Sequence, residues 1–163
     1  MQQNTLTQMI KKTLTYDEAL HKSAAYCSLS EHCTSELIDK FKYWEVLPEH
    51  RDKIIEFLVR EKYIDEKRFA SAFVKDKFNY NKWGKIRLRL ELKAKKIEES
   101  IIEEALAEIR EKEYRMMITK LIREKEKNLE YRNEYEKKGK LFRYLSGKGF
   151  ENEFISKAIG NYE

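Results

Sequence analysis

An internal repeat constrains the fold of this chain more than any other feature of its sequence. A shift of 53 residues superimposes two sets of apolar positions, Leu88, Leu92, Ile97, Ile101 and Ala105 on Leu141, Leu145, Phe150, Phe154 and Ala158. Leu37 and Phe41 take the places of Leu88 and Leu92 in a looser first copy. Apolar residues that recur four positions apart lie on one face of a helix. A repeat of about 50 residues therefore predicts three copies of a three-helix module in series.

The composition agrees with an all-α fold. The chain has 163 residues but only one proline and five glycines, too few for the many turns of a β-sandwich or a Rossmann-like fold. Charged residues make up 39% of the chain, and its commonest types, Glu, Lys and Leu, favour helices. We predict a flexible N-terminus at residues 1–14 and a tandem array of three three-helix modules at residues 15–63, 64–110 and 111–163.

Capping motifs mark several helix starts. Thr15 and Glu18 form a capping box ahead of a helix over about residues 16–29. Pro48 suits the first turn of a third helix, because its missing N–H costs nothing there. Asp65 is a good N-cap for a helix that begins the second module.

Two segments leave alternatives open. Lys96 stands where the third module has Gly149, a residue suited to the left-handed turn that ends a helix. Either the turn differs in the second module or Lys96 carries strain. The charged residues 125–138 form either an extended helix or a long connection.

Positive charge is concentrated in the second module. Residues 66–96 contain eleven basic and three acidic residues, a net charge of +8, whereas the whole chain carries +5. Seven of these basic residues lie between Asn81 and Ile97: Lys82, Lys85, Arg87, Arg89, Lys93, Lys95 and Lys96. A local excess points to an anionic partner more than a general solubility bias would.

The same stretch alternates apolar and polar residues from Ile86 to Leu92, as a half-buried strand would. The repeat makes it a helix with two apolar sides instead. We expect Leu88 and Leu92 to face the core of their own module, and Ile86 and Leu90 to fill a second buried interface. A module between two others needs two such faces.

The sequence contains no motif of an enzyme or a metal site. His21, Cys27, His32, Cys33 and His50 match no common zinc spacing, so we expect no structural metal. There is no nucleophile elbow, Gly-rich phosphate loop or metalloprotease motif, so we expect neither catalysis nor a cofactor. The acidic pairs at residues 98–99 and 103–104 indicate a solvated helix face.

No apolar run approaches the roughly 20 residues of a membrane span, and residues 1–12 lack the core of a signal peptide. We therefore expect a cytoplasmic protein with reduced cysteines and no membrane partner. We also expect a monomer, because repeats in series need no dimer to close their core.

Two aromatic residues accompany the basic stretch. Tyr80 and Trp83 are flanked by Lys77, Lys82 and Lys85, so the rings can stack on bases while the lysines hold phosphates. Alternatively, Trp83 packs between two modules.

Further residues resemble the RecX family of recombination regulators. The resemblance rests on Ile64-Asp-Glu-Lys-Arg-Phe-Ala70, Gly84-Lys-Ile-Arg87, Glu91-Leu92 and Ile97, and upstream on Thr34-Ser-Glu-Leu37 with Lys40. It covers residues 19–109 well and the third module by periodicity only. Lys85 and Lys96 depart from it, standing where the family has a frequent proline and its usual glycine.

The resemblance implies a non-enzymatic modulator of the RecA recombinase, an elongated and curved array that binds in the groove of the RecA–DNA filament. Such a protein lowers ATP hydrolysis and strand exchange. The basic module agrees, because it can meet RecA acids, DNA phosphates or both. The candidate contact residues are Arg68, Lys82, Trp83, Lys85, Arg87, Arg89, Lys93, Lys95 and Lys96, with Arg87, Arg89 and Lys93 ranked first.

The alternative is a stand-alone DNA- or RNA-binding protein, because three-helix modules also resemble helix-turn-helix units. A structural scaffold would leave the +8 module unexplained.

Overall fold

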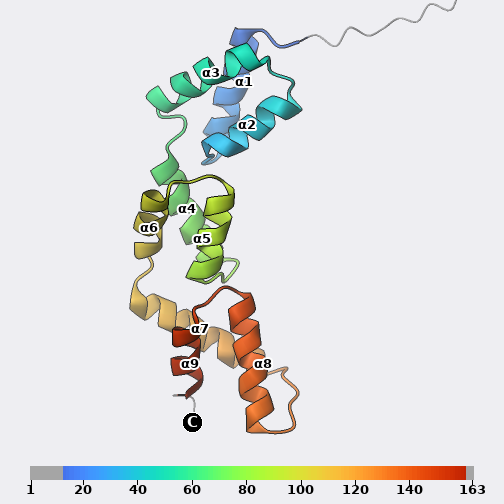
Figure 1. Ribbon diagram of the computed structural model, residues 1–163, viewed down its shortest axis with the longest axis vertical. Helices are drawn as coiled ribbons and strands as arrows, with labels where there is room; N and C mark the ends of the chain where they lie inside the picture. Colours follow the sequence, from blue (N-terminus) through green and yellow to red (C-terminus); the bar gives the residue numbers. More distant parts are fainter. Residues whose placement is uncertain (1–12, 161–163) are drawn as a thin grey trace, which may run out of the picture. The chain divides into compact units, whose positions relative to one another are not determined.

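The computed structural model describes residues 13–160, which form helices and connections without a strand (Figure 1). In chain order the helices are α1 (Tyr16–Leu29), α2 (Thr34–Tyr43), α3 (Pro48–Arg60), α4 (Glu66–Asn79), α5 (Lys85–Ala94), α6 (Glu99–Ala107), α7 (Glu111–Glu126), α8 (Glu134–Gly147) and α9 (Asn152–Gly160). The all-α prediction is confirmed. Residues 1–12, most of the predicted flexible N-terminus, lie outside the described residues.

The chain divides into two compact units, with the break between Ile64 and Asp65. The first unit holds α1, α2 and α3, and the second holds α4 to α9. The finer division into three modules at residues 15–63, 64–110 and 111–163 stays a prediction, as does the elongated and curved shape.

In the first unit, α1 and α3 begin at the capping residues predicted from the sequence. The Thr15 hydroxyl accepts a hydrogen bond from the Glu18 N–H at 3.2 Å, and the Glu18 carboxylate accepts one from the Thr15 N–H at 2.9 Å. Pro48 is the first residue of α3. Helices α1 and α2 each pack on α3, and their apolar faces bury a core that includes Leu37 and Phe41.

In the second unit, α4, α5 and α6 pack on one another. The Asp65 side chain caps α4, as predicted, by accepting a hydrogen bond from the Arg68 N–H at 3.0 Å. The alternating stretch is a helix, α5, and its Leu88 and Leu92 are fully buried.

The second apolar side of α5 does not form the expected buried interface. Ile86 is 45% exposed and Leu90 is 62% exposed, so that expectation is wrong. The contact with the following helices lies elsewhere: the N–H groups of Gly84 and Ile86 donate to carbonyls of the turn between α8 and α9, and the Lys85 N–H donates to the Tyr114 hydroxyl of α7. These contacts leave the Ile86–Leu90 side of the helix open to solvent.

The last three helices also pack on one another. Helix α7 ends at Glu126 and α8 begins at Glu134, so the charged residues 125–138 consist of two helix ends joined by a connection at residues 127–133. That connection is shorter than the one considered from the sequence.

One turn recurs at the same place in each helix triplet. The backbone N–H of the residue after the turn donates to a carbonyl five residues earlier, from Val46 to Phe41 at 2.9 Å, from Ile97 to Leu92 at 3.2 Å and from Phe150 to Leu145 at 3.2 Å. The left-handed residues of these turns are Glu45 (φ 57°), Lys96 (φ 61°) and Gly149 (φ 89°). This is the Schellman arrangement. The turn at Lys96 is therefore conformationally like the others, and Lys96 carries the strain, which costs about 1 kcal/mol.

Candidate partner-binding surface

The basic residues of α5 divide between two sides of the helix. On the side facing α6, Arg89 pairs with Glu99 and Glu103, and the Lys93 ammonium lies 3.0 Å from the Glu99 carboxylate. The hydrogen bond from Lys93 is the main reason why the pKa of Glu99 is lowered. The hydrogen bond to Glu103 is the main reason why the pKa of Arg89 is raised. Two of the three cations that we ranked first are thus already matched by acids of α6.

On the other side of α5, Arg87 lies over the ring of Trp83, with the guanidinium carbon 4.1 Å from the ring centroid. The Lys77 ammonium lies 5.5 Å from the same centroid, and Phe73 packs against the ring at 6.3 Å. The carboxylate nearest to Arg87 is Glu91, at 3.8 Å. Trp83 is half-buried among side chains of α4 and α5, and these contacts hold Arg87 in place by cation–π attraction.

Two loops, 65 residues apart in sequence, meet backbone to backbone beside Arg87. The Gly84 N–H donates to the Lys148 carbonyl at 2.8 Å, and the Ile86 N–H donates to the Gly149 carbonyl at 3.0 Å. A Cβ atom on Gly84 would lie 2.3 Å from the carbonyl carbon and oxygen of Gly149. We call this contact, residues 82–87 and 148–150, the junction. Only glycine at position 84 allows it.

Tyr114 of α7 connects the two loops of the junction. Its fully buried ring packs against Phe78, Phe150 and Phe154, with centroids 6.0, 5.2 and 5.1 Å away. Its hydroxyl accepts a hydrogen bond from the Lys85 N–H at 2.9 Å and donates one to the Glu151 carboxylate. Burial, and then the hydrogen bond to Glu151, raise the pKa of Tyr114. One side chain of α7 therefore ties the start of α5 to the start of α9.

The junction contains four basic residues; the Lys85 ammonium lies over the Tyr114 ring, and the other three are Lys82, Arg87 and Lys148. Lys82 has a φ of 58° and its ammonium donates to the Asn79 carbonyl, and the Lys148 ammonium lies 5.4 Å from the Tyr144 ring centroid. Burial lowers the pKa of Lys148, and the charges of Arg87 and Lys82 lower it further. Lys148 was missed from the sequence, although the 53-residue shift places it on Lys95, a candidate.

The remaining candidates have varied surroundings. Arg68 is exposed in the first turn of α4, and Lys96 is exposed at its strained turn. The Lys85 ammonium lies 5.2 Å from the Tyr114 ring centroid, and that of Lys95 lies 5.9 Å from the rings of both Phe69 and Phe73. A binding role for these residues stays a prediction.

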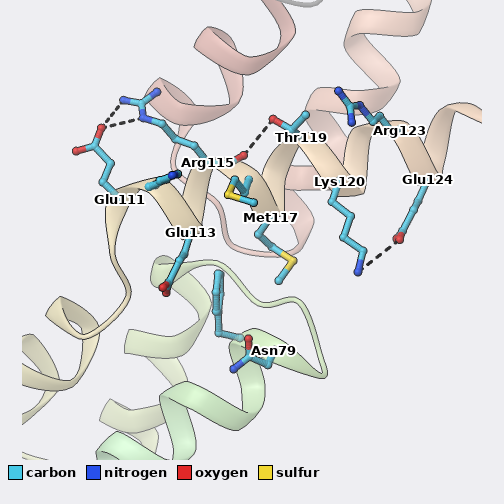
Figure 2. A pocket seen from close by; sticks show the side chains of 12 residues that line it. Asn79, Glu111, Glu113, Arg115, Met117, Thr119, Lys120, Arg123 and Glu124 are labelled. Carbon is cyan, nitrogen blue, oxygen red and sulfur yellow. Dashed lines mark hydrogen bonds and ion pairs between the residues drawn. The ribbon is translucent and has the colours of Figure 1, made fainter.

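A second feature of this unit is an open groove of about 970 Å³ along α7 (Figure 2). Its lining includes Met117 and Asn79, with Asn79 at the end of α4. Arg115 pairs with Glu111 at 2.6 Å, and Lys120 with Glu124 at 3.9 Å. The exposed lining of the groove is mainly apolar, although the charged residues Lys112, Glu113 and Arg123 also belong to it.

Three further findings concern residues 13–160. No group of three or more His, Cys, Asp or Glu side chains could hold a metal ion there. No helix in this part of the chain is both long and apolar enough to cross a membrane. Cys27 and Cys33 are buried free thiols, and burial is the main cause that raises the pKa of Cys27 to about 11.

The fold and this surface define an all-α protein of three-helix modules with a cationic junction. A family profile described as "RecX, second three-helix domain" matches residues 65–106. The regulatory protein RecX of Finegoldia magna is 30% identical over 151 residues, which cover 90% of this chain and 73% of the relative. The chain belongs to the RecX family of regulatory proteins.

Other relatives agree. The regulatory proteins RecX of Oceanobacillus iheyensis and Enterococcus faecalis are 28% and 27% identical, over 87% and 96% of this chain. The chain spans only 54% and 59% of their lengths. A crystal structure of regulatory protein RecX superimposes with a TM-score of 0.78 at 22% identity, covering 89% of this chain and 74% of that one. The crystal structure of RecX from Lactobacillus salivarius gives 0.77 at 23% identity, covering 90% and 95%. At these identities the two structures establish the fold.

Proposed function

We propose that this chain binds the RecA–DNA filament and lowers RecA's ATP hydrolysis and strand exchange without catalysing a reaction itself. The single observation that carries the proposal is the net charge of +8 at residues 66–96 in a chain of the RecX family. A nucleoprotein filament is strongly anionic, and a cationic surface gains both affinity and association rate from such a partner.

The contacts of α5 refine which cations serve this role. Arg89 and Lys93 already have acids of α6 as partners, and a new partner would have to replace them. At the junction, Arg87 lies 3.8 Å from Glu91, and within residues 13–160 neither the Lys82 nor the Lys148 ammonium has a carboxylate partner. We therefore place the main filament contact at the junction, with Arg68, Lys85, Lys95 and Lys96 as secondary candidates.

Co-sedimentation tests the binding step. RecA filaments assembled on single-stranded DNA are pelleted with increasing amounts of the chain, and the bound fraction is measured. We expect saturable binding by the wild type, weaker binding by Arg87→Glu, and wild-type binding by Lys120→Glu, which reverses a charge on α7 that is paired with Glu124. A wild-type chain that stays in the supernatant at all concentrations would overturn the proposal.

A stand-alone DNA- or RNA-binding protein is the second candidate, and the same +8 segment favours it. Each contact with a duplex phosphate would then add about −0.9 to the slope of log affinity against log salt. Titration of bare nucleic acid at several salt concentrations measures this slope. The second candidate fails if binding disappears at physiological salt while RecA filaments still capture the chain.

A further inference from the structure

We propose that the junction binds single-stranded DNA directly, with Lys82, Arg87 and Lys148 holding backbone phosphates and Tyr80 stacking on a base. The inference deepens the proposed function, on which it rests for the presence of DNA in the filament. It assigns the junction to the nucleic acid and not to an acidic surface of the recombinase.

The cations are positioned by backbone, not by flexible side chains alone. Gly84 follows Lys82 and Trp83, and its N–H is bonded to the carbonyl of Lys148 itself. Arg87 lies directly against Gly149, because a Cβ atom added there would be 2.4 Å from the Arg87 Cβ. Cations from two separate loops are thus fixed side by side before any ligand arrives, which lowers the ordering cost of binding.

Two of the junction's cations lack an acidic partner among the described residues, whereas Arg87 lies 3.8 Å from the Glu91 carboxylate of its own helix. Within residues 13–160, neither the Lys82 nor the Lys148 ammonium pairs with a carboxylate. Like charges held close together destabilise one another unless an anion joins them. Arg87 adds a guanidinium that lies over Trp83, and a guanidinium can donate two parallel hydrogen bonds to a phosphate. The α6 side of the same helix differs, because its own acids match Arg89 and Lys93.

An exposed aromatic ring favours a single strand over a protein surface or a duplex. Tyr80, two residues before Lys82, is 82% exposed, so its ring packs little against its own unit. Bases of a single strand offer free faces on which such a ring stacks, whereas duplex bases are already stacked on one another. Proteins that bind single strands combine cations, which contact the phosphates, with exposed aromatic rings, on which the bases stack.

Fluorescence anisotropy with a labelled oligothymidylate, in the absence of RecA, tests the cations. Lys82→Gln/Lys148→Gln should weaken binding about tenfold at low salt. It should also reduce the magnitude of the salt slope by about 1.4, since each single-strand phosphate contact contributes roughly 0.7. The control is Lys120→Gln/Lys157→Gln, which removes two charges that are paired along their own helices in the same unit. It should keep wild-type affinity.

A second pair of variants tests the stacking. Tyr80→Ala should weaken binding by roughly tenfold or more, and Tyr80→Phe should restore it, because stacking needs the ring but not the hydroxyl. Tyr135 is 89% exposed on α8 and supplies the matched control. Tyr135→Ala should bind as the wild type does.

Two results would overturn the inference. One is a Lys82→Gln/Lys148→Gln variant with the affinity and salt slope of its control. The other is a variant that binds the oligothymidylate normally but no longer inhibits RecA, which would place the junction against recombinase acids. That second result leaves the proposed function intact. If the wild type binds the oligothymidylate but does not inhibit RecA, the proposed function fails and the inference about the junction remains.

Discussion

Replacing Gly84 by alanine should destabilise the second unit by about 3–5 kcal/mol. The new Cβ would lie 2.3 Å from two backbone atoms of Gly149 and 2.4 Å from the N atom of Phe150. Backbone atoms cannot rotate away, so the two loops must separate. Separation breaks two hydrogen bonds, of 2.8 and 3.0 Å, worth about 1 kcal/mol each. Overpacking adds about 1–3 kcal/mol.

Two further variants isolate this steric effect. Gly84 is the N-cap of α5, with φ −77° and ψ 168°, a conformation that alanine adopts without strain. Gly84→Ser carries the same Cβ on a better capping residue, so it should lose nearly as much stability as Gly84→Ala. Gly139→Ala is the opposite case. Gly139 lies inside α8 with nothing within 4 Å of an added Cβ, so alanine should stabilise by about 1 kcal/mol.

Urea denaturation followed by circular dichroism at constant pH measures all three variants of the full chain. A loss of less than about 1 kcal/mol in both Gly84 variants would refute the close backbone contact, because no loop rearrangement that keeps both hydrogen bonds accommodates the Cβ.

Two other predictions concern polar contacts of the second unit. Tyr114→Phe keeps the buried ring but removes the hydroxyl that bonds the Lys85 N–H and the Glu151 carboxylate. It should lower the free energy of unfolding, measured by urea denaturation, by about 2 kcal/mol. An unchanged urea midpoint would contradict this role of the hydroxyl. Glu99 has a lowered pKa in the folded state, chiefly through its hydrogen bond from Lys93, so its stabilising contribution is present above the unfolded-state pKa and is lost as pH falls through the folded-state pKa. Glu99→Gln should therefore lower stability at neutral pH and converge with wild type in acid; equal differences at both pH values would count against the ion pairs with α6.

The helices were predictable because their signals are local. Apolar residues four apart and the caps at Thr15, Pro48 and Asp65 each depend on a few neighbouring residues, and these predictions are confirmed. The alternation at Ile86–Leu92 misleads when read alone, and the repeat corrects it to a helix. The repeat could not show that Ile86 and Leu90 stay exposed, because their exposure depends on which side of α5 contacts the following helices.

The junction was not predictable in the same way. Its hydrogen bonds join backbone groups 63 and 64 residues apart in the sequence, and such contacts leave no periodic pattern in side-chain chemistry. Glycines at positions 84 and 149 were the available clue, since a close approach requires the absence of a Cβ atom. The count of basic residues also overestimated how many cations are available to a partner, because the acids that pair with Arg89 and Lys93 come from the next helix.

The most direct test of the account is a titration of RecA's DNA-dependent ATP hydrolysis with the wild-type chain. We predict that hydrolysis falls at amounts of the chain near or below those of RecA, and that Lys120→Gln/Lys157→Gln inhibits as the wild type does. Hydrolysis that stays constant from far below to far above the RecA concentration would contradict the account.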